Sequence, residues 1–209
     1  MIFEAADKMK NFEAGIFNIL DDKRKELESQ GRKIYNFSVG TPDFEPEEHI
    51  MKAVSEACLH PENYRYALSD RDELLEAVIR RYKHRYHTDI AKNEIMSVYG
   101  SQEGMTHIFL PLINPGDVVL LPNPGYPIFN TGAFVAQASQ WLYPLTEEND
   151  YLPDLAAIPE DVRRAAKVMV VSYPANPICK TAPDSFYEEL ITFARENEIL
   201  IIHDNAYSD

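Results

Sequence analysis

The segments DVVLLP at residues 117–122 and ILIIHD at residues 199–204 decide the fold class of this chain. Both are nearly continuous apolar runs, which is typical of β-strands that are covered on both faces. Three further apolar runs have the length of strands: EIMSVY (94–99), QWLYPL (140–145) and AKVMVVSYP (166–174). Helical or turn segments separate these runs, so the sequence predicts an α/β fold with a mostly parallel sheet and helices on both faces.

Helices are predicted before the strands and between them. Apolar residues recur at helical spacing in DELLEAVIRRYKHRY (72–86) and in PDSFYEELITFAREN (183–197), which begins at a proline. Two more helices are expected in IFNILDDKRKELESQGRK (16–33) and around EEHIMKAVSEACL (47–59). Between these two, IYNFSVGTPDFEP (34–46) is expected to form a short strand that runs into a turn.

The charge and composition of the chain exclude several classes of partner. Its 209 residues include 34 Asp and Glu against 20 Lys and Arg, so a nucleic acid or an anionic membrane is not expected to bind. The N-terminus lacks the basic start and apolar run of a secretory signal, and no apolar stretch approaches the roughly 20 residues that span a bilayer. The two cysteines, Cys58 and Cys179, lie far apart in the sequence. A cytoplasmic protein with two incidental thiols is therefore predicted.

Unusual polar residues follow the strands, where parallel sheets collect their ligands. The first are Ser101 and Gln102, which come after the predicted strand 94–99 and Gly100, at the expected start of a helix. Backbone amides and a hydroxyl at a helix start suit a phosphate group. Ser101 is equally compatible with a plain N-cap, so this stretch alone leaves both interpretations open.

Two proline-rich turns present one residue each. Tyr126 follows a strand in LPNPGYP, where a rigidly held ring could stack on a flat heterocycle. Asn176 lies between two prolines in SYPANP, where its amide could donate to an anionic or phenolic oxygen. Read alone, each stretch favours the simpler alternative, which is a tyrosine that covers apolar neighbours and an asparagine that only shapes the turn.

The stretch HDNAYSD at 203–209 carries an acid at the end of an apolar strand. Successive strand residues point to opposite faces, so His203 and Asp204 are not expected to share one site, and no metal site is predicted. A buried carboxylate without a partner is costly, so Asp204 implies a cationic or protonated-nitrogen ligand. Tyr207, three residues later, is close enough in the sequence to address the same ligand.

Taken together, these stretches resemble the fold-type I, aspartate-aminotransferase-like family of pyridoxal-phosphate enzymes, and within it the class I/II aminotransferases. The likeness is nearest to aminotransferases of the LL-diaminopimelate type. It implies pyridoxal 5′-phosphate as cofactor and amino-group transfer between an amino acid and a 2-oxo acid. A C–S lyase or a decarboxylase of the same fold is the alternative. The resemblance rests on VGTPDF, GSQEG, NPGDVVLLPNPGYP, YLPDLAAIPEDV, SYPANP and HDNAYSD.

The resemblance assigns three catalytic residues around the cofactor ring. Asp204 would pair with the protonated pyridine nitrogen, which keeps the ring an electron sink. Tyr207 and Asn176 would hydrogen-bond the phenolic oxygen of the ring. Tyr126 would stack on the ring. The cofactor carries the chemistry, and these side chains would orient it and set its electronics.

The resemblance also assigns residues to the phosphate, to the substrate and to a second subunit. Ser101 and Gln102 would hold the cofactor phosphate. Gly40 would lie where the substrate carboxylate docks, with Asn176 as the second substrate-binding residue. Tyr66, or as an alternative Tyr64, would reach the phosphate of the neighbouring subunit, which implies a homodimer with shared active sites.

Under the same resemblance, residues 1–45 form an N-terminal arm and a small-domain segment, and residues 46–209 form the N-terminal part of the large cofactor-binding domain. The family's Asn-Pro-Thr-Gly turn is Asn-Pro-Ile-Cys at residues 176–179. The family's Schiff-base lysine and substrate-carboxylate arginine are expected beyond Asp209, so the fold is expected to be incomplete at the C-terminus. Lys180, the last lysine, is expected to be a solvated surface residue. A non-catalytic cofactor-binding or dimerising module is the alternative function.

Overall fold

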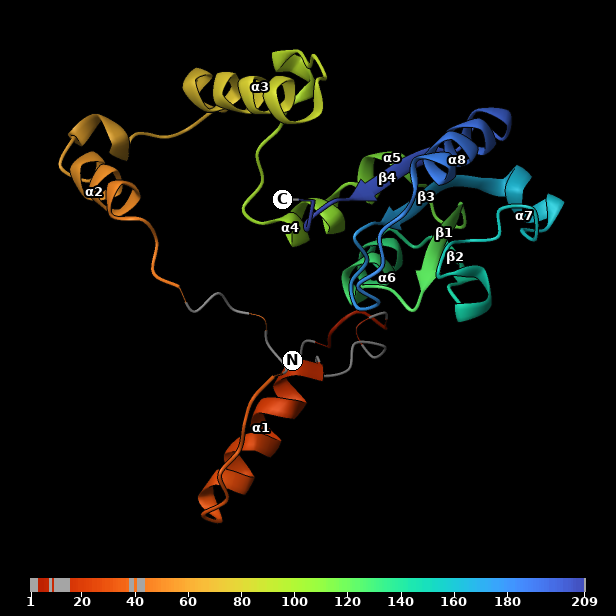
Figure 1. The fold of residues 1–209 in the computed structure, drawn as a ribbon, viewed down its shortest axis with the longest axis horizontal. Helices are drawn as coiled ribbons and strands as arrows, with labels where there is room; N and C mark the ends of the chain where they lie inside the picture. The colour runs from red at the N-terminus through yellow and green to blue at the C-terminus, as the bar shows by residue number, and fades with distance from the viewer. Residues whose placement is uncertain (1–3, 8, 10–15, 38–39, 41–43, 209) are drawn as a thin grey trace. The chain divides into compact units, whose positions relative to one another are not determined.

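The computed structural model describes residues 4–7, 9, 16–37, 40 and 44–208 (Figure 1). The chain divides into two compact units, Met1–Leu68 and Ser69–Asp209. The division falls between Leu68 and Ser69, and the boundary expected after residue 45 stays a prediction.

The first unit contains two helices, α1 (Ile16–Ser29) and α2 (Glu48–Ala57), and a 3-10 turn (Pro61–Tyr64). Both helices were predicted. The strand expected within 34–46 is wrong for residues 34–37, which are not paired into a sheet, and residues 38, 39 and 41–43 lie outside the described part. A strand needs a hydrogen-bonded neighbour as well as an apolar sequence.

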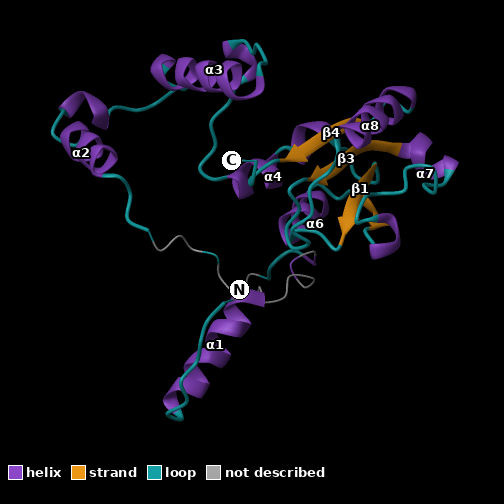
Figure 2. Ribbon diagram, viewed as in Figure 1, coloured by secondary structure: helices purple, strands orange, loops and turns teal. Residues whose placement is uncertain are grey.

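The second unit is built on a four-stranded parallel sheet (Figure 2). Its spatial order is β2-β1-β3-β4, and each pair of neighbouring strands is parallel. These four strands confirm the predictions at 117–122, 140–145, 166–174 and 199–204. Their bounds are β1 Val118–Asn123, β2 Ser139–Pro144, β3 Ala166–Ser172 and β4 Leu200–Asp204.

The strand predicted at 94–99 is wrong. The segment begins with a 3-10 turn (Lys92–Glu94) and continues through an extended Ile95, but it pairs with no strand in the described part of the chain. The Ser97 backbone amide donates instead to the Asp70 carboxylate, 3.0 Å away, and the Ser97 hydroxyl bonds to the same carboxylate. These bonds lower the pKa of Asp70. A side chain therefore takes the donor that a neighbouring strand would have used.

Eight helices are described in all, six of them in the second unit, where helices were predicted at 72–86, after Gly100 and at 183–197. Helix α3 covers Asp72–Tyr86, with acidic residues in its first turn and basic residues in its last, as the helix dipole favours. The other five are α4 Ser101–His107, α5 Phe109–Leu112, α6 Pro127–Val135, α7 Glu160–Ala165 and α8 Asp184–Glu196. A further 3-10 turn spans Glu147–Asn149.

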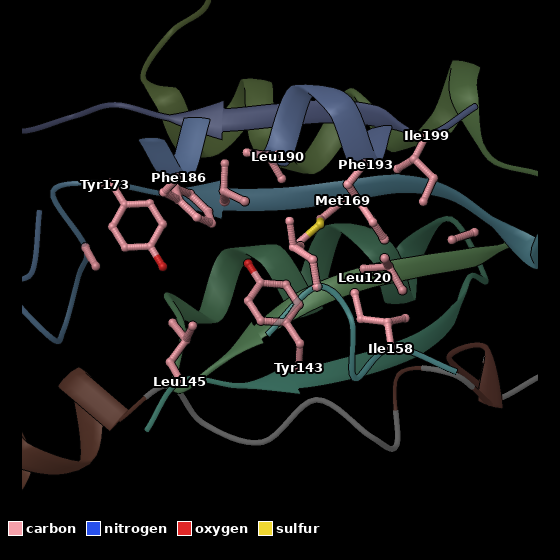
Figure 3. Packing of buried hydrophobic residues seen from close by; sticks show 14 residues of the cluster. Leu120, Tyr143, Leu145, Ile158, Met169, Tyr173, Phe186, Leu190, Phe193 and Ile199 are labelled. Carbon is pink, nitrogen blue, oxygen red and sulfur yellow. The ribbon is translucent and has the colours of Figure 1, made fainter. Parts of the chain in front are cut away.

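One face of the sheet packs against α8 (Figure 3). Leu120 of β1 and Met169 of β3 are fully buried there, and three side chains of α8 cover them: Phe186, Leu190 and Phe193. The buried Tyr143 of β2 donates its hydroxyl to the Val170 carbonyl at 2.5 Å, which satisfies the one polar atom that the ring brings into this layer. Burial raises the pKa of Tyr143 well above its ordinary value.

The opposite face packs against α4, α5 and α6. The strand residues that alternate with the first set, such as Val119 and Val168, are buried here against Phe109 and Phe129. Because side chains on a strand alternate between faces, each strand serves both layers. The prediction of a mostly parallel sheet covered by helices on both faces is confirmed.

Gly132 of α6 lies in close contact with α4 and α5 in this second layer. A Cβ atom there would stand 2.6 Å from the Met105 carbonyl oxygen and 2.8 Å from the Phe109 ring. Gly132→Ala is therefore expected to lower the free energy of unfolding by about 1–3 kcal/mol, as overpacking of a core does. Urea denaturation would measure the change.

Gly104 of α4 is the matched control, because its Cβ would make ordinary contacts of 3.4 Å or more with Val98. Gly104→Ala should leave the stability unchanged or raise it by up to about 1 kcal/mol, since alanine favours a helix. Equal destabilisation by the two substitutions would contradict the close approach at Gly132.

Candidate functional site

The site predicted from the sequence lies at the carboxyl ends of β1, β3 and β4, which the parallel pairing brings to one edge of the sheet. Tyr126 follows β1, Asn176 follows β3, and Asp204 ends β4. Ser101 and Gln102 open α4 in the same unit. The chain thus collects its polar strand ends where an open parallel sheet holds ligands.

Tyr126 is fixed by the turn that carries it and by Gln102. Gly125 precedes it, and a Cβ at that glycine would stand 2.6 Å from the Pro122 carbonyl oxygen, so the tight turn requires glycine. The Gln102 side-chain amide donates to the Tyr126 hydroxyl at 2.7 Å, and the Tyr126 ring lies edge-on to Phe129 at 6.2 Å. The ring is thus held in place between α4 and α6.

Ser101 is the first residue of α4, and Gly100, with φ of 94°, is its N-cap. The interpretation of Ser101 as the N-cap is therefore wrong, because the chain enters the helix through a backbone conformation that glycine adopts easily. The Ser101 side chain is exposed, and in the part of the chain that the structure describes its hydroxyl makes no hydrogen bond. It stays available to a ligand.

Asn176 and Tyr207 meet across two loops. The Asn176 side-chain amide donates to the Tyr207 hydroxyl at 3.2 Å. The turn that carries Asn176 is closed by two backbone bonds, from Ala175 N to the Lys180 carbonyl at 2.8 Å and from Cys179 N to the Ala175 carbonyl at 2.7 Å. Asn176 therefore sits on a fixed turn and points its amide at a phenol from the neighbouring segment.

His203 and Asp204 face opposite sides of the sheet, as the strand alternation predicts. His203 lies on the side of α8, where its ring is 5.6 Å from the Tyr187 ring and its Nε2 bonds to the Tyr173 carbonyl at 3.1 Å. A carbonyl only accepts, so Nε2 carries the proton. Tyr173 begins the loop that carries Asn176. His203 therefore supports that loop from the side of the sheet that α8 covers.

The Asp204 carboxylate is partly buried and lacks a partner. Among the described residues, none donates a hydrogen bond to it or forms an ion pair with it. Burial raises the pKa of Asp204, and the charge of His203 opposes that rise. A cationic ring nitrogen would supply the missing partner. The donor set at this edge, a carboxylate beside an amide and a phenol, thus fits a protonated pyridine with a phenolic oxygen.

Four residues of the sequence analysis lie outside this group. Gly40 and Tyr66 belong to the first unit, and their roles stay predictions. Tyr66 is 93 % exposed, whereas the alternative, Tyr64, donates its hydroxyl to the Cys58 carbonyl at 2.7 Å. Lys180, which was expected to be a solvated surface residue, is partly exposed, and its ammonium forms an ion pair with the exposed Asp150 at 2.5 Å.

Neither a metal site nor a membrane-spanning helix is found within the described ranges. No group of three or more His, Cys, Asp or Glu side chains there could hold a metal ion. Cys58 and Cys179 are free and exposed. None of the described helices is both long and apolar enough to cross a membrane.

Comparison with known proteins identifies the family of this chain. The family described as "Aminotransferase class I and II" matches residues 32–209. LL-diaminopimelate aminotransferase of Aquifex aeolicus is 39 % identical over 210 residues, which cover the whole chain and 54 % of that protein. The enzyme of the same name from Syntrophobacter fumaroxidans is 36 % identical over 211 residues, with the same coverage.

Solved structures agree as well. Apo-BacF of Bacillus subtilis superposes with a TM-score of 0.90 at 36 % identity, over 97 % of this chain and 52 % of that one. A probable N-succinyldiaminopimelate aminotransferase of Thermus thermophilus gives 0.85 at 36 % identity, over 92 % of this chain and 52 % of that one. An aspartate aminotransferase of Thermus thermophilus, 21 % identical, gives 0.90 and supports the fold alone.

The chain belongs to the class I and II aminotransferase family, whose members depend on pyridoxal phosphate. It spans about half the length of the curated relatives that it matches. The family predicted from the motifs is confirmed, while the roles of the individual site residues stay predictions.

The raised pKa of Asp204 predicts a pH effect on the stability of the chain without cofactor. Because the pKa lies above the ordinary value of 3.8, the folded chain binds this proton more tightly than the unfolded chain. The contribution of Asp204 to stability is then greatest below 3.8 and falls as pH rises through the folded-state pKa. The amide of Asp204→Asn does not ionise, so the stability of this variant should not fall with pH on account of residue 204.

Urea denaturation of both proteins from about pH 4 to about pH 7 would measure the difference. The free energy of unfolding of Asp204→Asn, minus that of the unsubstituted chain, should increase with pH. A difference that stays constant or decreases would contradict the burial of an unpaired carboxylate.

Proposed function

We propose that this chain forms the cofactor-binding part of an aminotransferase that moves an amino group between an amino acid and a 2-oxo acid. The observation that carries the proposal is Asp204, a partly buried carboxylate without a partner, at the same sheet edge as the Asn176–Tyr207 pair. An unpaired acid beside neutral donors fits a ligand that carries a cation and an oxygen on one flat ring.

When bound, pyridoxal phosphate supplies a ring that withdraws electrons from the substrate carbon. Asp204 would accept a hydrogen bond from the protonated ring nitrogen and keep that nitrogen charged. Asn176 and Tyr207 would both donate to the phenolic oxygen of the ring. These three side chains come from two strand ends and the loops after them, so the sheet itself fixes their spacing.

The remaining residues hold the rest of the cofactor. Tyr126 would stack on the ring, and its bond to Gln102 keeps it from rotating away. Ser101 offers a free hydroxyl to the phosphate at the start of α4. Gly40 and Tyr66 are proposed to reach the substrate carboxylate and the phosphate of a second subunit, as part of a cytoplasmic homodimer.

The names of the relatives support a diamino acid as the amino donor. Two relatives that align over the whole chain are LL-diaminopimelate aminotransferases. The whole protein is therefore proposed to act on LL-diaminopimelate or on a similar amino acid. Lys180 is held by Asp150, so we propose that a different lysine of the whole protein bonds to the cofactor.

Asp204→Ala tests the catalytic proposal in the whole protein. Because the ring nitrogen loses its carboxylate, kcat/KM for amino transfer from LL-diaminopimelate to a 2-oxo acid should fall by about 100-fold or more. Asp161→Ala in α7 removes an exposed carboxylate elsewhere and should leave the rate unchanged. Full activity of Asp204→Ala would rule out the proposed role.

Tyr126 tests cofactor binding by the chain itself. Tyr126→Ala should weaken pyridoxal phosphate about twofold to tenfold, since aromatic pairing contributes about 0.5–1.5 kcal/mol. Tyr126→Phe keeps the ring and loses only the bond from Gln102, so its effect should be smaller. Absorbance titration would measure both dissociation constants, with the exposed Tyr35→Ala as control. Equal affinity of all four proteins would exclude stacking.

A further inference from the structure

We propose that Tyr86 and Arg85, at the end of α3, are positioning residues that hold Tyr207 toward Asn176 by binding Ser208. This inference rests on the proposed function for the importance of Tyr207, but the contact itself is a feature of the fold. Neither residue was singled out from the sequence, where Tyr86 and Arg85 are two more residues of an amphipathic helix.

Two hydrogen bonds join α3 to Ser208. The Tyr86 hydroxyl lies 2.8 Å from the Ser208 hydroxyl, and the Arg85 guanidinium donates to the Ser208 carbonyl at 3.0 Å. One bond holds the side chain and the other holds the backbone of the same residue. Together they fix both the position and the orientation of Ser208.

The segment after β4 has few other contacts. Strand β4 ends at Asp204 and is followed by a short turn at residues 206 and 207. Tyr207 is 54 % exposed, and its hydroxyl is joined to Asn176 by a bond of 3.2 Å. A single bond of that length is weak support for a half-exposed ring. The neighbouring Ser208 is the better-held residue.

Contacts within the last turns of α3 order the side chains that meet Ser208. The Tyr86 ring packs edge-on against Tyr82 at 5.2 Å, and the Arg85 guanidinium lies 5.7 Å from the centre of the same ring. His87 closes the helix in the left-handed conformation, and its amide donates to the Tyr82 carbonyl. The Tyr86 hydroxyl is therefore placed by packing before it meets Ser208, and holding Ser208 costs little additional side-chain entropy.

Loss of the contact should affect one part of the cofactor site and spare another. Tyr207 would address the phenolic oxygen of the ring, so freeing Ser208 weakens the hold on the ring. Ser101 and Gln102 lie on α4, which the Ser208 contact does not touch. Binding of pyridoxal phosphate should therefore weaken while binding of inorganic phosphate stays the same.

Tyr86→Phe and Ser208→Ala each remove the hydroxyl-to-hydroxyl bond from the 209-residue chain. Each should weaken pyridoxal phosphate by about threefold to tenfold, the effect of one hydrogen bond, and the double variant should add little more. Ser208→Thr keeps the hydroxyl and should restore the affinity. Tyr82→Phe, one turn earlier in α3, is the matched control and should bind like the unsubstituted chain.

Hydrogen exchange of the amides of residues 205–208 gives a readout that needs no cofactor. Exchange there should accelerate in Tyr86→Phe and Ser208→Ala, and not in Tyr82→Phe. If the unsubstituted chain fails to bind pyridoxal phosphate, the proposed function is wrong, and the positioning role falls with it even where exchange confirms the contact.

Three results would overturn the positioning role when the unsubstituted chain does bind the cofactor. The first is unchanged exchange in both variants. The second is faster exchange with unchanged affinity for pyridoxal phosphate, since the contact would then order the segment without placing Tyr207. The third is an equal loss of affinity for pyridoxal phosphate and inorganic phosphate, which is the result of a general structural defect.

Discussion

The rest of the structure depends on the burial of β1 and β3 from both sides. Leu120 and Met169 pack toward α8, while Val119 and Val168 pack toward α5 and α6, and all four are nearly or fully inaccessible to water. Burying an aliphatic side chain of this size contributes about 1.5–3 kcal/mol. Two layers thus share the same strands, so the positions of the strand ends follow from the packing of the core.

That constraint explains why so few polar residues are enough to build the site. β1, β3 and β4 are parallel, so the segments after them leave the same edge of the sheet. Asp204 ends β4 and Asn176 lies in the loop after the adjacent β3, so both leave the sheet at the same edge. The loops then fix the individual side chains. The closed turn at Ala175–Lys180 holds Asn176, and the bond from Gln102 holds Tyr126.

Local pattern predicted most of the fold, because the four strands and α3 are decided by apolar runs and by helical spacing over neighbouring residues. The strand expected at 94–99 shows where local pattern is insufficient. Its sequence is apolar, but Ser97 bonds to Asp70, and Met96 and Tyr99 stay exposed. Whether an extended segment joins a sheet depends on a partner distant in sequence, which a single segment does not reveal.

The residues of the candidate site could be predicted from the sequence, but the contacts that support them could not. Asp204, Tyr207 and Asn176 follow recognisable strands and belong to motifs of a known family, so they could be named from the sequence. The contact of Tyr86 with Ser208 could not, because 122 positions separate the two residues and each is ordinary in its own segment. The bond of His203 to the Tyr173 carbonyl was equally hidden, since the sequence does not tell which face of the sheet α8 will cover.

The opposite orientation of His203 and Asp204 has a consequence for how this chain can vary. His203 contacts α8 and the Asn176 loop, whereas Asp204 is proposed to bind the ligand. An insertion or deletion of one residue within β4 would exchange the two faces, and would turn the imidazole toward the proposed ligand and the carboxylate toward Tyr187. The five residues of β4 must therefore keep their count.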